Sequence, residues 1–189
     1  MGKIDALLIG GSAGSLDVLL KVLPHIDPAI DFAIIIIVHR KHGADSLLPD
    51  LLSGKTLLRV KEAEEKEAIT PGTVYIAPSD YHLLIERDHT ISLDYSEKIN
   101  YSRPAIDATF QTAAEVYQDR LACLLLSGSN ADGVNGLQTV KRWNGLALIQ
   151  SPASAQVAYM PEQARIHVAI DRILNIEDMA DFINLLSQL

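Results

Sequence analysis

A serine lies in a glycine-rich turn close to the start of the chain. The run Ile9-Gly10-Gly11-Ser12-Ala13-Gly14 follows a short apolar stretch typical of a strand, and leucines at helical spacing come after it. Ser12 is therefore predicted in a tight strand-to-helix turn, where glycine permits sharp backbone conformations. Read as G-x-S-x-G, the turn would expose a nucleophilic hydroxyl, with backbone N–H groups around Gly11 and Ala13 as oxyanion donors. A serine that only caps the helix is the alternative.

Two more residues suited to ester chemistry follow predicted strands. His39 closes the apolar run 34–38, and Asp132 lies in a glycine-containing turn directly after the apolar run 121–126. The carboxyl ends of parallel strands meet at one edge of a sheet, so both side chains are expected near Ser12. A hydroxyl, an imidazole and an orienting carboxylate make an acyl-transfer site. Taken singly, His39 could bond a loop carbonyl and Asp132 could cap the following helix.

The remaining titratable residues suggest no second site. Asp107, which follows Pro104 near a helix start, is interpreted as a surface acid matched to the helix dipole. His42 is a fallback for the base, and Cys123 lies in an apolar run typical of the core. No two His or Cys residues have recognised ligand spacing on one element, so no metal is expected. No cofactor is expected either, because the Gly-rich turn lacks both G-x-G-x-x-G and the P-loop lysine.

Composition points to one globular domain over residues 1–189. The chain has 189 residues, 48% of them hydrophobic, and a formal net charge of −8. The absence of a dense Lys/Arg run argues against nucleic acid and anionic membrane surfaces as partners. The longest apolar run, Phe32 to Val38, is too short to span a bilayer. With a single cysteine and no secretory signal pattern, the chain is expected in the reducing cytoplasm.

Apolar strand-like runs alternate with helical patterns, which predicts an α/β fold. Continuous apolar strands flanked by helices indicate a doubly wound, mostly parallel sheet with helices on both faces. The predicted strands are Ala6–Ile9, Ala33–His39, Leu57–Val60, Leu121–Leu126 and Leu146–Ile149. The predicted helices are Leu16–Leu23, Ser46–Leu52, Ile106–Tyr117, Val134–Trp143 and Ile176–Leu186.

The pattern changes between residues 73 and 94. Short strand-like runs at Thr73–Ala77, His82–Ile85 and Thr90–Leu93 are separated by turn signals, which predicts a small antiparallel excursion. The charged stretch Lys61 to Lys66 is expected to be a solvated loop or a sheet edge.

Six ordered segments of this chain resemble the catalytic domain of CheB-type protein-glutamate methylesterases. The resemblance extends over essentially the whole chain. Residues 9–15 are similar to the family pattern I-G-A-S-x-G-G, residues 37–39 to a strand ending in His, and residues 71–82 to P-G-x-x-Y-I-A-P followed by Tyr-His. Residues 103–107 are similar to R-P-S-x-D, residues 126–133 to L-T-G-x-x-x-D-G, and residues 155–161 to A-x-x-x-x-M-P.

The resemblance implies a Ser-His-Asp hydrolase. It makes Ser12 the nucleophile, His39 the general base and Asp132 the orienting acid. It also implies that the substrates are glutamate γ-methyl esters on the cytoplasmic helices of chemoreceptors, or on another methylated protein, and that receptor glutamines can be deamidated.

Three departures from the family pattern bear on this interpretation. Ser15 replaces the second glycine of the opening pattern, and Ser129-Asn130 replaces the Met-Gly of a G-M-G turn. The first could alter packing at the helix start, and the second could alter substrate fit. Because Ser12 lies so near Met1, the phosphorylatable receiver domain that usually precedes this domain is expected to be absent. A docking or signalling module that keeps the fold without hydrolysis is therefore the alternative function.

Substrate recognition is expected to depend on loops around an open cleft at the sheet edge. Local cations would have to offset the negative net charge if an acidic protein substrate is steered to the site. Arg40, Lys41 and Arg103 are candidates, and Arg103 is the preferred one because it lies in the family-like Arg-Pro segment. His82 is a second candidate for substrate contact.

Overall fold

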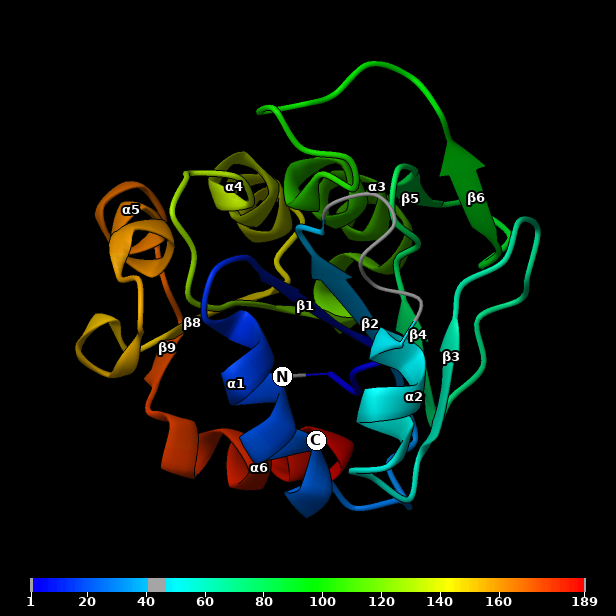
Figure 1. Ribbon diagram of the computed structural model, residues 1–189, viewed down its shortest axis with the longest axis horizontal. Coiled ribbons are helices and arrows are strands. Elements are labelled where there is room, and N and C mark those ends of the chain that lie inside the picture. The colour runs from blue at the N-terminus through cyan, green and yellow to red at the C-terminus, as the bar shows by residue number, and fades with distance from the viewer. Residues whose placement is uncertain (1, 41–46, 189) are drawn as a thin grey trace.

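The sheet at the centre of the molecule is fully parallel. The structure is a computed structural model that describes residues 2–40 and 47–188. Seven strands pair in the order β3-β4-β2-β1-β7-β8-β9 (Figure 1). They are β1 (Ala6–Gly11), β2 (Ala33–Val38), β3 (Arg59–Glu62), β4 (Thr73–Ile76), β7 (Leu121–Leu125), β8 (Leu146–Gln150) and β9 (Arg172–Leu174). Strand β1 is central: β2 to β4 are added on one side of it, and β7 to β9 are added on the other. The carboxyl ends of β1, β2 and β7 therefore meet at the topological switch point of the sheet.

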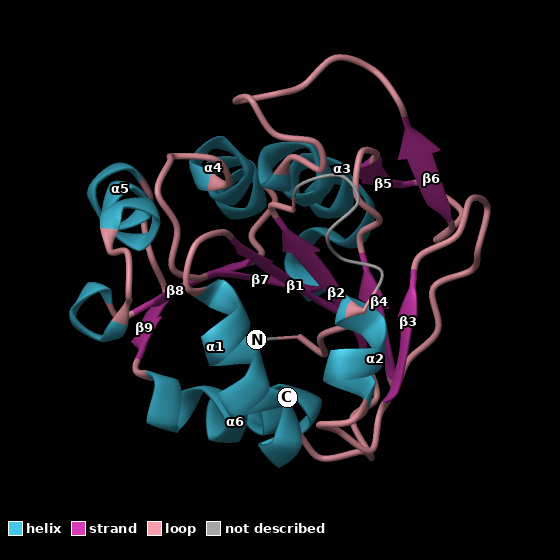
Figure 2. Cartoon of the chain, viewed as in Figure 1, coloured by secondary structure: helices cyan, strands magenta, loops and turns pink. Residues whose placement is uncertain are grey.

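Helices cover both faces of the sheet, as the sequence predicted. Figure 2 shows α1, α2 and α6 on one side and α3, α4 and α5 on the other. Their bounds are α1 (Ser15–Val22), α2 (Leu48–Ser53), α3 (Ile106–Tyr117), α4 (Val134–Arg142), α5 (Tyr159–His167) and α6 (Ile176–Leu185). Short 3₁₀ turns occupy Leu23–His25, Gln118–Arg120, Pro152–Ser154 and Leu186–Gln188.

The run of isoleucines in β2 divides between two hydrophobic cores. Ile34 and Ile36 face the core under α1, α2 and α6, whereas Ile35 and Ile37 face the core under α3, α4 and α5. All six residues of β2 are buried, because side chains alternate across a sheet that is covered on both faces. Rigid strands of this kind hold the loops at their carboxyl ends in fixed positions.

The antiparallel excursion is real but shorter than predicted. It consists of one hairpin, β5 (His82–Ile85) and β6 (Ile91–Asp94). The run 73–77 was assigned to it wrongly, since β4 pairs in parallel with both β2 and β3. Its four residues are all buried, and that burial on both faces is the mark of a central strand. The strand predicted at Leu57–Val60 is β3, which begins two residues later at Arg59 and takes the first two residues of the charged stretch into the sheet edge.

Two elements were missed. Helix α5 contains a proline and several polar residues, and only three of its nine residues are buried, so its apolar period is weak. Strand β9 is three residues long and two of them are exposed. Both lie at the side of the sheet remote from β3, and because few of their own residues are buried, their sequence pattern is faint.

Candidate active site

Ser12 lies in the turn between β1 and α1, at the carboxyl edge of the central strand. The Ser12 N–H donates to the carbonyl of Ser127 at 2.9 Å, and the Ser15 hydroxyl donates to the Ser12 carbonyl at 2.6 Å. Gly14 has φ of 82°, and a Cβ there would lie 2.7 Å from Gln156. The turn therefore requires glycine at this position, and the serine that departs from the family pattern at residue 15 stabilises the helix start.

Ser127 and Gln150 fix this turn from the neighbouring strands. The Ser127 hydroxyl donates to the carbonyl of Ala13 at 2.7 Å, and its backbone N–H donates to Gln150 Oε1 at 2.9 Å. Both residues are fully buried. Sequence reasoning missed them, although a polar residue at the end of an apolar strand, as Gln150 is in β8, or just beyond one, as Ser127 is after β7, is a usable signal of a supporting network.

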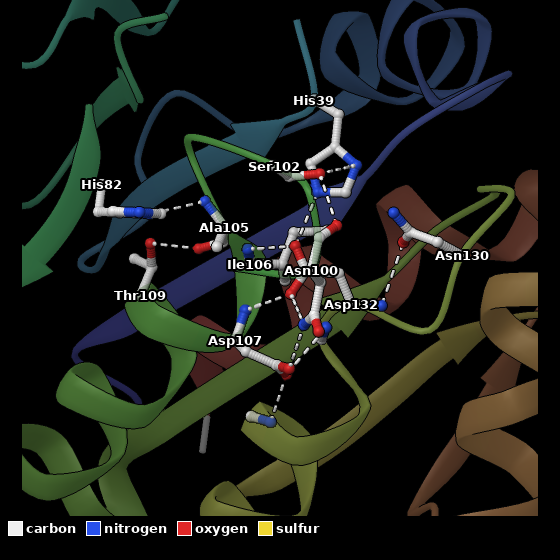
Figure 3. A network of polar contacts seen from close by, with 12 residues as sticks. His39, His82, Asn100, Ser102, Ala105, Ile106, Asp107, Thr109, Asn130 and Asp132 are labelled. Atoms are coloured by element: carbon white, nitrogen blue, oxygen red, sulfur yellow. Dashed lines mark hydrogen bonds and ion pairs between the residues drawn. The ribbon is translucent and has the colours of Figure 1, made fainter. Parts of the chain in front are cut away.

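His39 and Asp132 form a short hydrogen bond at the same edge. His39 Nε2 lies 2.7 Å from Asp132 Oδ2 (Figure 3). A carboxylate only accepts hydrogen bonds, so Nε2 carries the proton and Nδ1 is the basic nitrogen of the neutral ring. The Asp132 side chain is completely buried, whereas that of His39 retains 13% of its exposure. The imidazole thus joins a buried carboxylate to an accessible pocket.

The Asp132 carboxylate is held by the start of α3, not by the helix that follows it. It accepts the N–H of Ile106 at 2.7 Å and that of Asp107 at 3.0 Å. Burial raises the pKa of this carboxyl, but the hydrogen bonds from His39 and from the two backbone N–H groups outweigh burial and lower it. Asp132 therefore stays ionised and oriented toward His39.

Asp107 is buried, and its assignment as a surface acid was wrong. Only 3% of the residue is exposed, and Oδ1 accepts the N–H of Gly133 at 2.9 Å and of Gly136 at 2.7 Å. Each helix start thus has its backbone N–H groups hydrogen-bonded to a carboxylate from the other: Asp132 accepts from the start of α3, and Asp107 accepts from Gly133 and Gly136 at the start of α4. Burial raises the pKa of Asp107, as does the nearby Asp132 charge, while the backbone N–H groups lower it, and the net shift is upward. Sequence alone could not show that the two helix starts face each other.

Ser12 and His39 line one pocket of about 420 Å³. Within the described residues no hydrogen bond joins Ser12 Oγ to the imidazole, and His39 Nδ1 instead faces the Ser102 hydroxyl at 3.4 Å. The Ser12 N–H is committed to Ser127, so it cannot serve as an oxyanion donor in this arrangement. The N–H of Ala13 remains a candidate donor, while Gly11 lies inside β1 and its carbonyl accepts from the His39 N–H.

Three cationic side chains and one carboxylate also line this pocket: Arg40, Lys98, Arg103 and Asp80. Arg103 donates to Asp80 Oδ1 at 2.8 Å and to the Ser96 carbonyl at 2.6 Å, and its guanidinium stacks 3.9 Å from the Tyr95 ring centre. Hydrogen bonding to Asp80 raises the Arg103 pKa. Arg103 lines the pocket, but its N–H donors are already engaged by Asp80 and by the backbone of the surrounding loop. Lys98 is exposed and forms no ion pair with any described residue.

The other predicted site residues are placed differently. His82 is 1% exposed and is not among the described residues that line the pocket. Its Nε2 donates to the Glu97 carbonyl at 2.9 Å, and its Nδ1 accepts the Ala105 N–H at 3.2 Å. His82 therefore positions backbone, and the expectation of a substrate contact is corrected. Lys41 and His42 lie outside the described residues.

The turn before Asp132, which departs from the family pattern at Ser129-Asn130, still supports the backbone of Asp132. Asn130 Oδ1 accepts the N–H of Asp132 at 3.1 Å, and Gly128 packs so closely that a Cβ would lie 2.6 Å from Met160. Asn130 thus supports the backbone of Asp132. Cys123 is buried, as expected, and desolvation raises its thiol pKa well above the ordinary value, so it is unsuited to act as a thiolate nucleophile.

Comparison with known proteins decides the family. The sequence model of the CheB methylesterase family matches residues 7–183. The chain belongs to the CheB methylesterase family. The crystal structure of the Thermotoga maritima CheB methylesterase catalytic domain superposes with a TM-score of 0.92 at 30% identity, covering 100% of both chains.

Relatives of two sizes match this chain. A Leptospira interrogans protein, provisionally named a protein-glutamate methylesterase/protein-glutamine glutaminase, is 40% identical over 97% of this chain and 95% of its own length. A Methanosarcina mazei protein-glutamate methylesterase/protein-glutamine glutaminase is 33% identical over 94% of this chain but 50% of its own length. The resemblance inferred from sequence motifs is thus confirmed. Among residues 2–40 and 47–188, no helix is long and apolar enough to cross a bilayer.

Proposed function

We propose that this chain hydrolyses glutamate γ-methyl esters on a protein through Ser12, His39 and Asp132. The observation that carries the proposal is the 2.7 Å contact between His39 Nε2 and the buried Asp132 carboxylate, at the wall of a pocket that Ser12 also lines. That contact leaves His39 Nδ1 as the base on the pocket side. Family membership supports the same reaction, since the named relatives are protein-glutamate methylesterases.

The reaction proceeds through a covalent acyl-enzyme. Ser12 Oγ attacks the ester carbonyl as its proton passes to His39 Nδ1, and the Asp132 charge stabilises the imidazolium. The tetrahedral intermediate collapses, the carbonyl–methoxy bond breaks, and methanol leaves with the proton from Nδ1. Water then attacks the acyl group with His39 again as base, which frees Ser12 and the glutamate. With a glutamine side chain the first leaving group is ammonia.

The substrate proposed is a methylated chemoreceptor, and the site of action the cytoplasm. The pocket carries three cationic side chains and one anionic one, in a chain whose formal net charge is −8. Arg40 pairs with Glu62 at 3.3 Å and Arg103 with Asp80 at 2.8 Å. The charge that favours an acidic segment around the ester is therefore chiefly that of Lys98, which pairs with no described residue. Lys98 is the best placed contact, and Arg103 supports the wall in which Lys98 lies. We further propose that residues 1–189 act as one catalytic domain.

Methanol release from a methylated receptor tests the proposed function. We expect the wild-type protein and Ser53→Ala to release methanol equally, because Ser53 is exposed at the end of α2 and is not among the described residues that line the pocket. Ser12→Ala should release none above background while unfolding at the wild-type temperature. Equal release by Ser12→Ala would overturn the mechanism, and no release by the folded wild type would favour the docking module.

A further inference from the structure

One loop both lines the pocket and supports the catalytic carboxylate. Lys98, Tyr101, Ser102 and Arg103 contribute to the pocket wall. Between them Asn100 turns inward, and its Nδ2 donates to Asp107 Oδ2 at 3.1 Å and to Asp132 Oδ1 at 3.3 Å (Figure 3). A single amide group on an exposed loop thus connects two buried carboxylates that carry the same charge.

The backbone of this loop is shaped to deliver that amide. Ile99 and Ser102 exchange backbone hydrogen bonds at 3.2 and 2.9 Å, and the two residues between them have positive φ, 50° at Asn100 and 63° at Tyr101. Positive φ at both central positions is typical of type I′ turns, in which asparagine is favoured at the first. The side chain of Asn100 points toward the aspartates, whereas Tyr101 is 98% exposed.

We infer that Asn100 is a positioning residue for the catalytic pair. It binds Oδ1 of Asp132, which leaves Oδ2 for His39 Nε2, and it supplies a donor between Asp132 and Asp107 where their charges would otherwise repel. The two backbone N–H groups from α3 set the place of Asp132, but one of them shares Oδ2 with the imidazole. The amide completes the set of donors on Oδ1 and so fixes the rotation of the carboxylate.

Two substitutions remove the amide without opposing the turn. Asn100→Gly keeps free access to positive φ, and Asn100→Asp keeps the side-chain shape but places a third carboxylate against the first two. Asn144→Gly is the matched control, because Asn144 also has positive φ, 62°, in an exposed turn between α4 and β8.

The kinetic arm rests on the proposed function and uses the γ-methyl ester of an N-acetylglutamate amide. We expect kcat to fall about tenfold in Asn100→Gly and further in Asn100→Asp, with KM within about twofold of wild type, since a hydrogen bond to a charged group is strong. Asn144→Gly should retain wild-type kcat. Wild-type kcat in both Asn100 variants, or a rise in KM alone, would overturn the inference.

A second arm does not require turnover. The proton on His39 Nε2 that bonds to Asp132 should give a low-field nuclear magnetic resonance signal in the wild type and in Asn144→Gly. We expect that signal to move upfield or broaden in Asn100→Gly, with the unfolding temperature recorded alongside. An unchanged signal in a folded Asn100→Gly would refute positioning even if the wild type hydrolysed no ester.

Discussion

The two halves of the pocket differ in how completely they are assembled. On the side of α3, His39 and Asp132 are already paired, and Asp132 accepts hydrogen bonds from Ile106, Asp107 and Asn100. On the side of β1, Ser12 has a fixed backbone, yet no hydrogen bond joins its hydroxyl to His39 within the described residues. A buried carboxylate without hydrogen-bond partners would cost much free energy, so its partners must be present in the free protein. A neutral hydroxyl at a solvent-accessible pocket has no such cost, so its hydrogen bond to His39 can form when substrate binds.

This difference separates activity from stability. Residues of the paired half contribute to both, because they satisfy helix ends and buried charge. The hydroxyl of the serine half contributes to turnover alone. Substitutions in the two halves can therefore be compared by measuring kcat and the free energy of unfolding on the same variants.

Ser12→Ala is expected to have the largest effect on turnover. We predict a loss of at least about 1,000-fold in kcat, because the nucleophile is removed outright. The free energy of unfolding should change by less than about 0.5 kcal/mol, since the Ser12 hydroxyl forms no hydrogen bond with residues 2–40 or 47–188. Ester hydrolysis and urea unfolding measure the two quantities. A marked loss of stability would mean that the serine half is as structural as the other.

Asp132→Asn should impair both properties. We predict a fall of about 1,000- to 10,000-fold in kcat through the wrong imidazole tautomer. We also predict a loss of about 1–3 kcal/mol in unfolding free energy, because the Asn amide cannot accept from His39, Ile106 and Asp107 as the carboxylate does. The same two assays apply. A variant as stable as Ser12→Ala would remove the contrast between the halves.

The pH dependence of stability sharpens the comparison within the paired half. The pKa of Asp132 is lowered by folding, so its contribution is present above about pH 4, the unfolded value, and is lost as pH falls through the native pKa. The pKa of Asp107 is raised, so its contribution has the opposite sign and is lost as pH rises. Urea unfolding between pH 3 and pH 6 should show Asp132→Asn and Asp107→Asn changing the slope in opposite directions.

The smallest effects are expected at the pocket rim. Arg103→Ala should lower kcat/KM several-fold on a methylated receptor and on a small activated ester alike, because Arg103 holds Asp80 and the 95–96 loop. Lys98→Gln should raise KM about two- to fivefold for the receptor only, and less at high salt. If Arg103→Ala spared the small ester, Arg103 would contact the protein substrate directly, as the sequence had suggested.

The sequence predicted what depends on local pattern and strand topology. The buried strands, the helices with strong apolar periods, and the placement of Ser12, His39 and Asp132 after β1, β2 and β7 all follow from apolar runs and the parallel-sheet rule. The short elements α5 and β9 were missed because few of their residues are buried.

What sequence could not supply was the network between elements. Asp107 has the sequence position of an ordinary first-turn acid, because its partners, Gly133 and Gly136, are more than 25 residues away. Asn100 carried no signal at all, since its two contacts depend on a turn with positive φ. The motif predicts a substrate contact for His82, whereas its ring nitrogens bind backbone at two points of the one loop between β6 and α3.

Covalent labelling tests most directly the claim that Ser12 is the nucleophile served by His39 and Asp132. The protein would be treated with a fluorophosphonate, which traps activated serines, and the modified peptide would be mapped by mass spectrometry. The account predicts one adduct, on Ser12, formed much more slowly in Asp132→Asn. An adduct on Ser102, the hydroxyl that faces His39 Nδ1 at 3.4 Å, or labelling of Ser12 at equal rates in both proteins, would contradict it.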